Sequence, residues 1–152
     1  MKNITLIILV LFLYSCGYSS IYKNQESQKF KVNIIETIGD REMNNLIKNE
    51  MRLYSNKNTT NIYDLKIDTD YKKIILTKDS SGTITDYTLS ATSTFTINYK
   101  KKTQVFQFDE NINIKTQSDT FEQNIYEQNI KRNFASSIRE KLILAISNLN
   151  DN

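Results

Sequence analysis

The stretch TITDYTLSATSTFTINY, residues 83–99, decides the fold of this chain. Its apolar residues alternate with threonine and serine, and such residues favour extended backbone. The pattern predicts a long strand with one buried face and one polar face. The predicted core face carries Tyr87, Leu89, Ala91, Ser93, Phe95, Ile97 and Tyr99, and the other face carries Thr88, Ser90, Thr92, Thr94 and Thr96.

The segments on either side predict two antiparallel partners for this strand. Before it, Tyr63, Leu65 and Ile67 alternate with polar residues, and the strand continues to Leu76 with a bulge expected near Asp70, where the alternation slips. A turn at residues 79–82 joins the two strands. After it, Lys100-Lys101-Lys102 forms a second turn, and residues 104–115 form a fourth strand with Phe106, Phe108, Ile112 and Ile114 in one phase.

The remaining segments predict one further strand and two helices. Residues 29–37 form the first strand, and residues 41–54 form an amphipathic helix that Asp40 caps. Residues 119–150 form a second helix, capped by Asp119. Its apolar stripe is interpreted as core rather than a groove for a partner; it comprises Phe121, Ile125, Ile130, Phe134, Ile138, Leu142, Ile146 and Leu149.

The element order is therefore strand, helix, strand, strand, strand, helix. It predicts an α+β fold, with a four-stranded, mostly antiparallel sheet and two helices packed on one face. A chain of 152 residues suits one such domain, which we assign to residues 29–152.

The N-terminus predicts export from the cytoplasm. Residues 1–15 combine Lys2 with a short apolar run, which is typical of a secretory signal peptide and too short to span a bilayer. Leu13, Ser15 and Cys16 resemble the bacterial lipobox, in which the cysteine is acylated and becomes the new N-terminus. The alternative is a plain signal peptide, which would leave a lone free thiol in an oxidising compartment. Residues 16–28 then form a polar tether.

The composition excludes several classes of activity. There is no histidine and only one cysteine, which removes Ser-His-Asp and Cys-His catalysis, zinc sites of Cys and His, and any intramolecular disulfide. The net charge of +3 does not indicate nucleic-acid binding. The carboxylate pairs Asp68/Asp70 and Asp109/Glu110 lack the glycine-punctuated loop of a calcium site. We therefore predict no enzyme, no metal site and no cofactor other than the covalent lipid on Cys16.

Four local sequences, together with the element order, resemble the outer-membrane LPS-assembly lipoprotein family (LptE, also called RlpB). They are Cys16-Gly17-Tyr18, residues 46–53, the turn and strand start at residues 82–87, and residues 124–142 with Arg132 in mid-helix. The resemblance implies a non-enzymatic plug inside a large LptD-like β-barrel that inserts LPS into the outer leaflet. The lipoprotein would help that barrel to fold and would contact LPS. The alternative is a general outer-membrane lipoprotein that binds peptidoglycan or serves another envelope complex.

The resemblance also implies a location and a ligand site. Gly17, rather than aspartate, after the cysteine favours sorting to the outer membrane, with the globular part in the periplasm or the barrel lumen. Hairpin geometry places Lys78 and Lys115 at one end of the sheet. Basic residues near these strand ends are implicated in LPS contact in the family, and lipid A phosphates suit ammonium donors. The alternative is that both are solvated surface lysines.

Two further features carry open interpretations. The turn at Lys100, Lys101 and Lys102, at the opposite end, is a solubilising loop or edge guard, or else contacts the barrel lumen or anionic lipid. The hydroxyl face at Thr88, Ser90, Thr92 and Thr94 either faces solvent or packs against a barrel lumen, which is polar.

Overall fold

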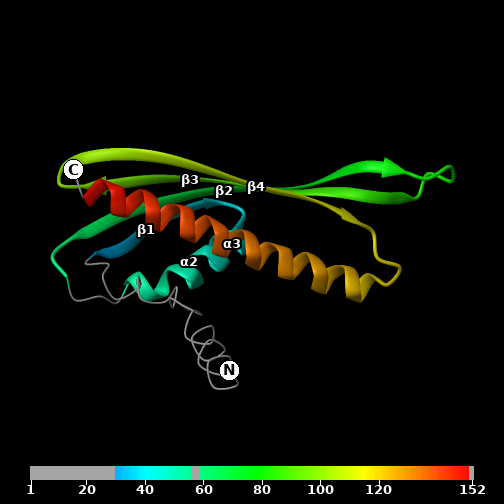
Figure 1. Cartoon of the computed structure of the whole chain (residues 1–152), viewed down its shortest axis with the longest axis horizontal. Coiled ribbons are helices and arrows are strands. Elements are labelled where there is room, and N and C mark those ends of the chain that lie inside the picture. The colour runs from blue at the N-terminus through cyan, green and yellow to red at the C-terminus, as the bar shows by residue number, and fades with distance from the viewer. Residues whose placement is uncertain (1–29, 56–58, 151–152) are drawn as a thin grey trace, which may run out of the picture.

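Four strands and two helices follow one another in the expected order (Figure 1). The computed structural model describes residues 30–55 and 59–150, so the expected signal peptide, tether and lipidated Cys16 lie outside the described residues. The elements are β1 (Lys31–Gly39), α2 (Arg41–Ser55), β2 (Ile62–Lys78), β3 (Ile84–Tyr99), β4 (Lys102–Lys115) and α3 (Thr120–Asn150). The predicted α+β fold is confirmed.

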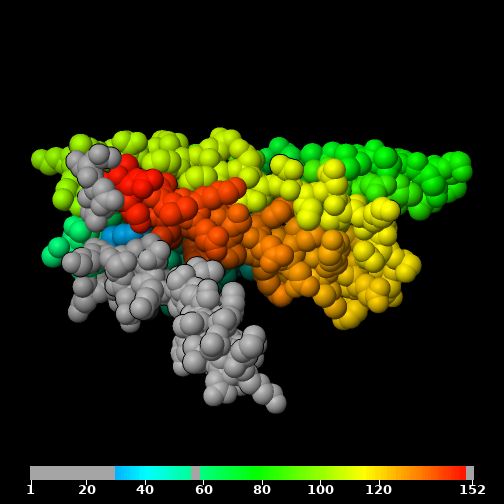
Figure 2. Space-filling view, viewed as in Figure 1, coloured from blue at the N-terminus to red at the C-terminus, as the bar shows by residue number. Residues whose placement is uncertain are grey.

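The sheet has the order β1-β2-β3-β4. β1 runs parallel to β2, with Lys31 opposite Ile62, and α2 forms the crossover between them. β2, β3 and β4 form an antiparallel meander. Figure 1 shows both helices on the same side of the sheet, with the β2–β3 hairpin projecting beyond them as an arm, which is the green extension at the right of Figure 2.

The core lies between the helices and one face of the sheet. The alternation that predicted β3 is confirmed, because Leu89, Ala91, Ser93, Phe95 and Ile97 are all buried. From the helices, the fully buried side chains are Met43, Ile47, Met51, Ala135, Ile138, Leu142 and Ile146. The hydroxyls of Thr69 and Ser93 lie 3.1 Å apart, so these two buried polar groups hydrogen-bond to each other.

The join between β1 and α2 requires glycine. Gly39 has φ +83°, and a Cβ there would lie 2.1 Å from the Thr69 carbonyl oxygen. Asp40 follows and caps α2 as expected, since its Oδ1 accepts a 2.8 Å hydrogen bond from the Met43 backbone N–H.

The expected bulge near Asp70 is wrong. Pairing between β2 and β3 continues without a shift from Asp64 to Ile75, and the register shifts only between Ile75 and Lys78. The alternation does not slip at this point because Thr69 is buried and hydrogen-bonded to Ser93, so a polar residue holds an inward position.

The second turn is shorter than expected. It consists of Lys100 and Lys101, while Lys102 already pairs with Tyr99 as part of β4. Both turn residues have positive φ, 45° and 66°. A two-residue hairpin loop needs this left-handed backbone to match the twist of its strands.

The N-terminal part of the expected α3 stripe is not core. Phe121 is 71% exposed and Ile125 is 46% exposed, and the buried apolar positions of α3 begin at Ile130. The helix diverges from the sheet towards its N-terminus (Figure 1), which agrees with the exposure of these two side chains. Neither of the two described helices is both long and apolar enough to cross a bilayer.

Candidate functional site

The face of the sheet opposite the helices is polar along most of its length. Thr88, Ser90, Thr92 and Thr94 are partly exposed there, as the sequence predicts. Thr88 donates a 2.8 Å hydrogen bond to Asn113, and Thr92 donates a 2.6 Å hydrogen bond to Asp109. The hydroxyls of β3 are therefore linked to the amide and carboxylate groups of β4.

The same polar character extends to the other strands. Asn33 on β1 donates a 2.8 Å hydrogen bond to Asp64, and Glu36 pairs with Lys66 at 2.6 Å. The hydrogen bond from Thr92, together with a weaker one from Gln107 and the charge of Lys141, lowers the pKa of Asp109. This face thus presents a prearranged set of donors and acceptors that suits another polar surface.

Lys78 and Lys115 lie at the same end of the sheet, on either side of β3. Lys78 is opposite Ile84, and Lys115 is opposite Asp86. Asp86 accepts hydrogen bonds from the hydroxyls of Thr77 and Thr85, and these together with the Lys115 charge lower its pKa. Lys115 therefore has a carboxylate close by, whereas Lys78 forms no salt bridge within the described part of the chain.

The β2–β3 arm ends in an ordered turn that follows directly after Lys78. One oxygen of Asp79 accepts hydrogen bonds from the backbone N–H of Ser81 and of Thr83, each at 2.9 Å, and from the Ser81 hydroxyl at 2.6 Å. These bonds lower the pKa of Asp79. The turn fixes the end of β2, and with it the position of Lys78.

Apolar side chains that the sequence reasoning did not predict to be exposed lie on the same half of the molecule. Ile74, Ile75 and Leu76 on the arm are each about half exposed, as is Ile125 at the start of α3. The sequence signal for this exposure was a run of three apolar residues in a strand that otherwise alternates. Successive side chains of a strand point to opposite faces, so one buried face cannot cover all three.

A set of ion pairs fixes α3 to the elements beneath it. Lys73 on β2 pairs with Glu127, and Lys131 pairs with Glu42 on α2. The Lys131 ammonium also lies 4.5 Å from the centre of the Tyr71 ring. Burial and the neighbouring carboxylates of Glu127 and Glu42 raise the pKa of Tyr71 to about 12. Each charged group in this cluster has a partner, which indicates that the cluster holds α3 in place.

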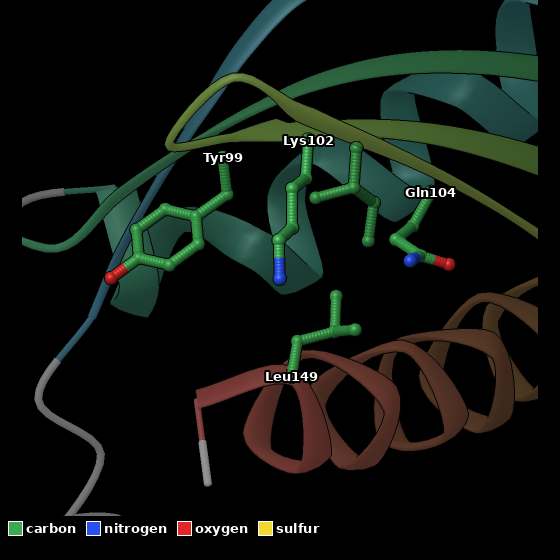
Figure 3. A pocket seen from close by; sticks show the side chains of 5 residues that line it. Tyr99, Lys102, Gln104 and Leu149 are labelled. Atoms are coloured by element: carbon green, nitrogen blue, oxygen red, sulfur yellow. The ribbon is translucent and has the colours of Figure 1, made fainter. Parts of the chain in front are cut away.

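The turn at Lys100 and Lys101 lies at the other end of the sheet, as expected. Both side chains are exposed, whereas Lys102 projects towards Leu149 over a hollow of about 190 Å³ (Figure 3). Ile97, Tyr99 and Gln104 complete its lining. This hollow combines apolar walls with one ammonium group.

No group of three or more potential metal ligands occurs within residues 30–55 and 59–150. The described side chains thus offer neither a metal centre nor, with every histidine absent from the chain, an imidazole base.

Comparison with known proteins identifies the architecture. No protein-family model matches the chain, and no curated protein matches it. Among solved structures, rare lipoprotein B from Shewanella oneidensis is 12% identical with a TM-score of 0.58, over 79% of this chain and 98% of that one. A minor lipoprotein from Acinetobacter baumannii is 15% identical with a TM-score of 0.51, over 80% and 94% of the two chains.

A third structure, lipoprotein B from Nitrosomonas europaea, is 9% identical with a TM-score of 0.55, over 80% of this chain and 85% of that one. Identities this low concern the fold and not the residues of the site. The resemblance expected from the sequence is confirmed at this level: the chain has the fold of rare lipoprotein B.

Proposed function

We propose that this chain is a lipid-anchored outer-membrane subunit of the LPS-assembly machine. In this role it plugs a large LptD-like β-barrel, supports the folding of that barrel and contacts LPS, without catalysing a reaction. The observation that carries the proposal is the fold shared with rare lipoprotein B, which extends over nearly the whole of that protein. The lipobox-like residues before Cys16 supply the anchor.

The polar face of the sheet supports the plug role. Barrel lumens are lined by polar side chains, so a protein inside one needs a polar surface of its own. The face offers the hydroxyls of Thr88 and Thr92, which cross-strand hydrogen bonds already hold in place, with the partly exposed Thr94 beside them. Such a surface gains contacts without losing side-chain freedom, which favours association. Lys101, at the tip of its turn, is a further candidate for barrel contact.

The end of the sheet that carries Lys78 and Lys115 supports the LPS contact. Lipid A combines phosphates with acyl chains, and this end combines two ammonium groups with half-exposed Ile74 and Leu76. Charge and apolar surface side by side match an amphipathic, anionic ligand.

A non-catalytic role is consistent with the remaining charged groups. The pairs Lys73–Glu127 and Lys131–Glu42 are engaged with each other and hold α3 in place. The carboxylates of Asp79, Asp86 and Asp109 all have lowered pKa values, the opposite of what a general acid requires.

The first experiment is a pull-down of the tagged, lipidated protein from its own outer membrane in mild detergent. We expect a large LPS-assembly barrel to co-purify in near-equal amount. Recovery of cell-wall material or of a different envelope complex, with no barrel, would contradict the plug role and favour a general outer-membrane lipoprotein.

A second experiment tests the ligand site. Lys78→Glu with Lys115→Glu should weaken LPS binding by the purified protein at least tenfold, because each substitution replaces an attraction to phosphate with a repulsion. The matched control is Lys66→Glu with Lys72→Glu, which makes the same change of charge elsewhere on the sheet. Equal LPS affinity in the two variants would remove these lysines from the site.

A further inference from the structure

The start of the described domain marks one end of the sheet. Lys31 begins β1, and its backbone N–H donates a 2.8 Å hydrogen bond to the Asn61 carbonyl, directly before β2. Asp64 on β2 is opposite Asn98 on β3. Asn98 comes directly before Tyr99, the last residue of β3. Lys31, the first residue of β1, therefore lies at the same end of the sheet as the β3–β4 turn.

The last turn of α2 reaches the same end. The rings of Phe30 and Tyr54 stack with centroids 5.9 Å apart, which brings the C-terminal end of α2 to the start of β1. The C-terminal end of α3 lies here as well, since Leu149 lines the hollow beside Tyr99 (Figure 3). We call this region the entry end; Figure 1 shows it opposite the β2–β3 arm.

The entry end is strongly basic. It carries five cations, Lys31, Arg52, Lys100, Lys101 and Lys102, and none of them forms a salt bridge with another described residue. Three carboxylates lie nearest to these cations, and Asp64 is the one without a cationic partner, since it accepts a 2.8 Å hydrogen bond from the Asn33 amide. Glu36 pairs with Lys66, and Glu50 pairs with Arg139 at 3.3 Å.

Apolar groups stand among these cations. Leu53, next to Arg52 in the last turn of α2, is 67% exposed. Ile62, opposite Lys31, is 45% exposed, and the Lys102 ammonium lies over the hollow that Leu149 and the Gln104 side chain line (Figure 3). Cations interspersed with exposed apolar side chains are the pattern of surfaces that lie at the headgroup level of a bilayer.

We propose that the entry end is a membrane-docking surface for anionic phospholipid headgroups in the leaflet that holds the Cys16 lipid. The proposal rests on the lipid anchor of the proposed function and is independent of the barrel and of LPS. Cys16 and Phe30 are separated by fourteen peptide units (30 − 16), which span at most roughly 50 Å. The anchor therefore keeps the basic surface within reach of the bilayer, where it binds without a large loss of translational freedom.

Docking fixes the orientation of the molecule. Before the chain is seated in the barrel, docking by the entry end holds the domain at the leaflet, with the arm and its Lys78 and Lys115 away from these headgroups. The two groups of lysines then act on different anions, one on phospholipid at the entry end and the other on the ligand at the arm.

The test uses the lipidated full-length protein in vesicles of phosphatidylcholine, with or without phosphatidylglycerol. The lipid blocks the only cysteine, so Thr60→Cys, beside Asn61 at the entry end, takes a fluorescent label specifically. Energy transfer from this label to a headgroup-bound acceptor reports docking. Ser80→Cys, in the arm turn, is the matched distal position.

The charge-removing variant is K100N/K101G/K102Q, whose first two changes suit the positive φ of the turn and preserve the fold. The control is R41Q/K72Q/R132Q, which removes three cations away from the entry end. Each cation contributes about fivefold to binding of an anionic surface, so the three changes should lower the ratio of docked to undocked protein about 100-fold.

We expect phosphatidylglycerol to raise transfer at position 60 but not at position 80, added salt to lower it, and only the turn variant to abolish it. Equal transfer at position 60 in neutral and anionic vesicles, or equal loss in both triple variants, would overturn the docking surface alone. Failure of the protein to float with vesicles of either composition would overturn the lipid anchor as well.

Discussion

At the scale of single residues, Gly39 is the position least open to change. Its left-handed backbone and the close Thr69 carbonyl join β1 to α2, and the adjacent Asp40 N–H donates to the same carbonyl at 2.6 Å. Gly82 in the arm turn has almost the same φ, +84°, but nothing lies within 4 Å of the place its Cβ would occupy. Substituting each glycine therefore distinguishes two contributions to the free energy of unfolding. At Gly82 only the backbone conformation opposes a side chain, whereas at Gly39 a steric clash is added.

We expect Gly82→Ala to lower the free energy of unfolding by about 1 kcal/mol, the usual cost of left-handed backbone in a residue with a Cβ. Gly39→Ala should cost about 3 kcal/mol or more, because the clash with Thr69 adds to the same backbone term. Urea unfolding of both variants measures the difference. Equal losses would show that the β1–α2 join relaxes to accept a methyl group.

Two buried tyrosines predict a loss of stability in alkali. Burial and the neighbouring Tyr99 raise the pKa of Tyr63 to about 12, and burial with nearby carboxylates does the same for Tyr71. In the unfolded chain both ionise near pH 10, so between about pH 10 and 12 the folded state binds more protons than the unfolded state. Stability contributed by their neutral forms is therefore complete below pH 10 and falls as pH rises through this window.

Unfolding in urea at a series of pH values checks this slope. The Tyr71 hydroxyl is buried without a hydrogen-bond partner, so Tyr71→Phe should fold normally and lose stability less steeply above pH 10. The exposed Tyr126→Phe serves as the control, with an unchanged slope. Identical slopes in all three proteins would show that Tyr71 ionises at an ordinary pKa in the folded state.

At the scale of elements, the sequence predicted most of the sheet because alternation and burial coincide in β3. In β4 they coincide only in part, since Phe106 and Phe108 are partly buried and Ile112 is 39% exposed. Prediction was less successful where one side chain's surroundings decide its face. In the sequence, Thr69 looks like a polar interruption of the alternation, and only its hydrogen bond to Ser93 explains its inward position. Phe121 continues the apolar stripe of α3, and only the direction of the helix axis explains its exposure. No local pattern contains the angle between α3 and the sheet, since that angle arises from packing of the whole molecule.

The divergence of α3 predicts unequal roles for two phenylalanines on one helix. Phe134→Ala should lower the free energy of unfolding by about 3–5 kcal/mol, because a buried ring is removed from the core. Phe121→Ala should change it by about 0.5 kcal/mol or less, because that ring is mostly in solvent. Thermal unfolding of the two variants provides the comparison. A large loss for Phe121→Ala would mean that the first turns of α3 pack on the arm in solution.

The candidate site could be predicted only in part from the sequence, because part of it depends on how the whole molecule packs. Strand register alone places Lys78 and Lys115 together and Lys101 apart from them, and the structure agrees. The basic entry end could not be read this way, because Arg52 comes from a helix and Lys31 from a parallel strand. Their proximity depends on the β1–α2–β2 crossover, whose geometry is not local.

At the scale of the whole molecule, both helices cover the same face of the sheet and leave the other face uncovered. Thr92→Val with Thr94→Val keeps the shape and the strand preference of both side chains but removes two hydroxyls. The isolated protein should then unfold within about 1 kcal/mol of the parent, while recovery of the barrel in the pull-down should fall severalfold. The control, Thr60→Val, lies outside the sheet. Full recovery of the barrel with the double variant would place the contact elsewhere.

The parallel pairing of β1 sets an order of assembly in time. β2, β3 and β4 are joined by short turns, whereas Lys31 pairs with Ile62 across the whole of α2. Short loops close with less loss of entropy than long ones, so we expect the meander to form before β1 joins it. For a chain that leaves the translocation channel N-terminus first, the earliest segment to emerge is then the last to be incorporated. A lipid on Cys16 would hold that waiting segment at the membrane while the rest of the sheet is built.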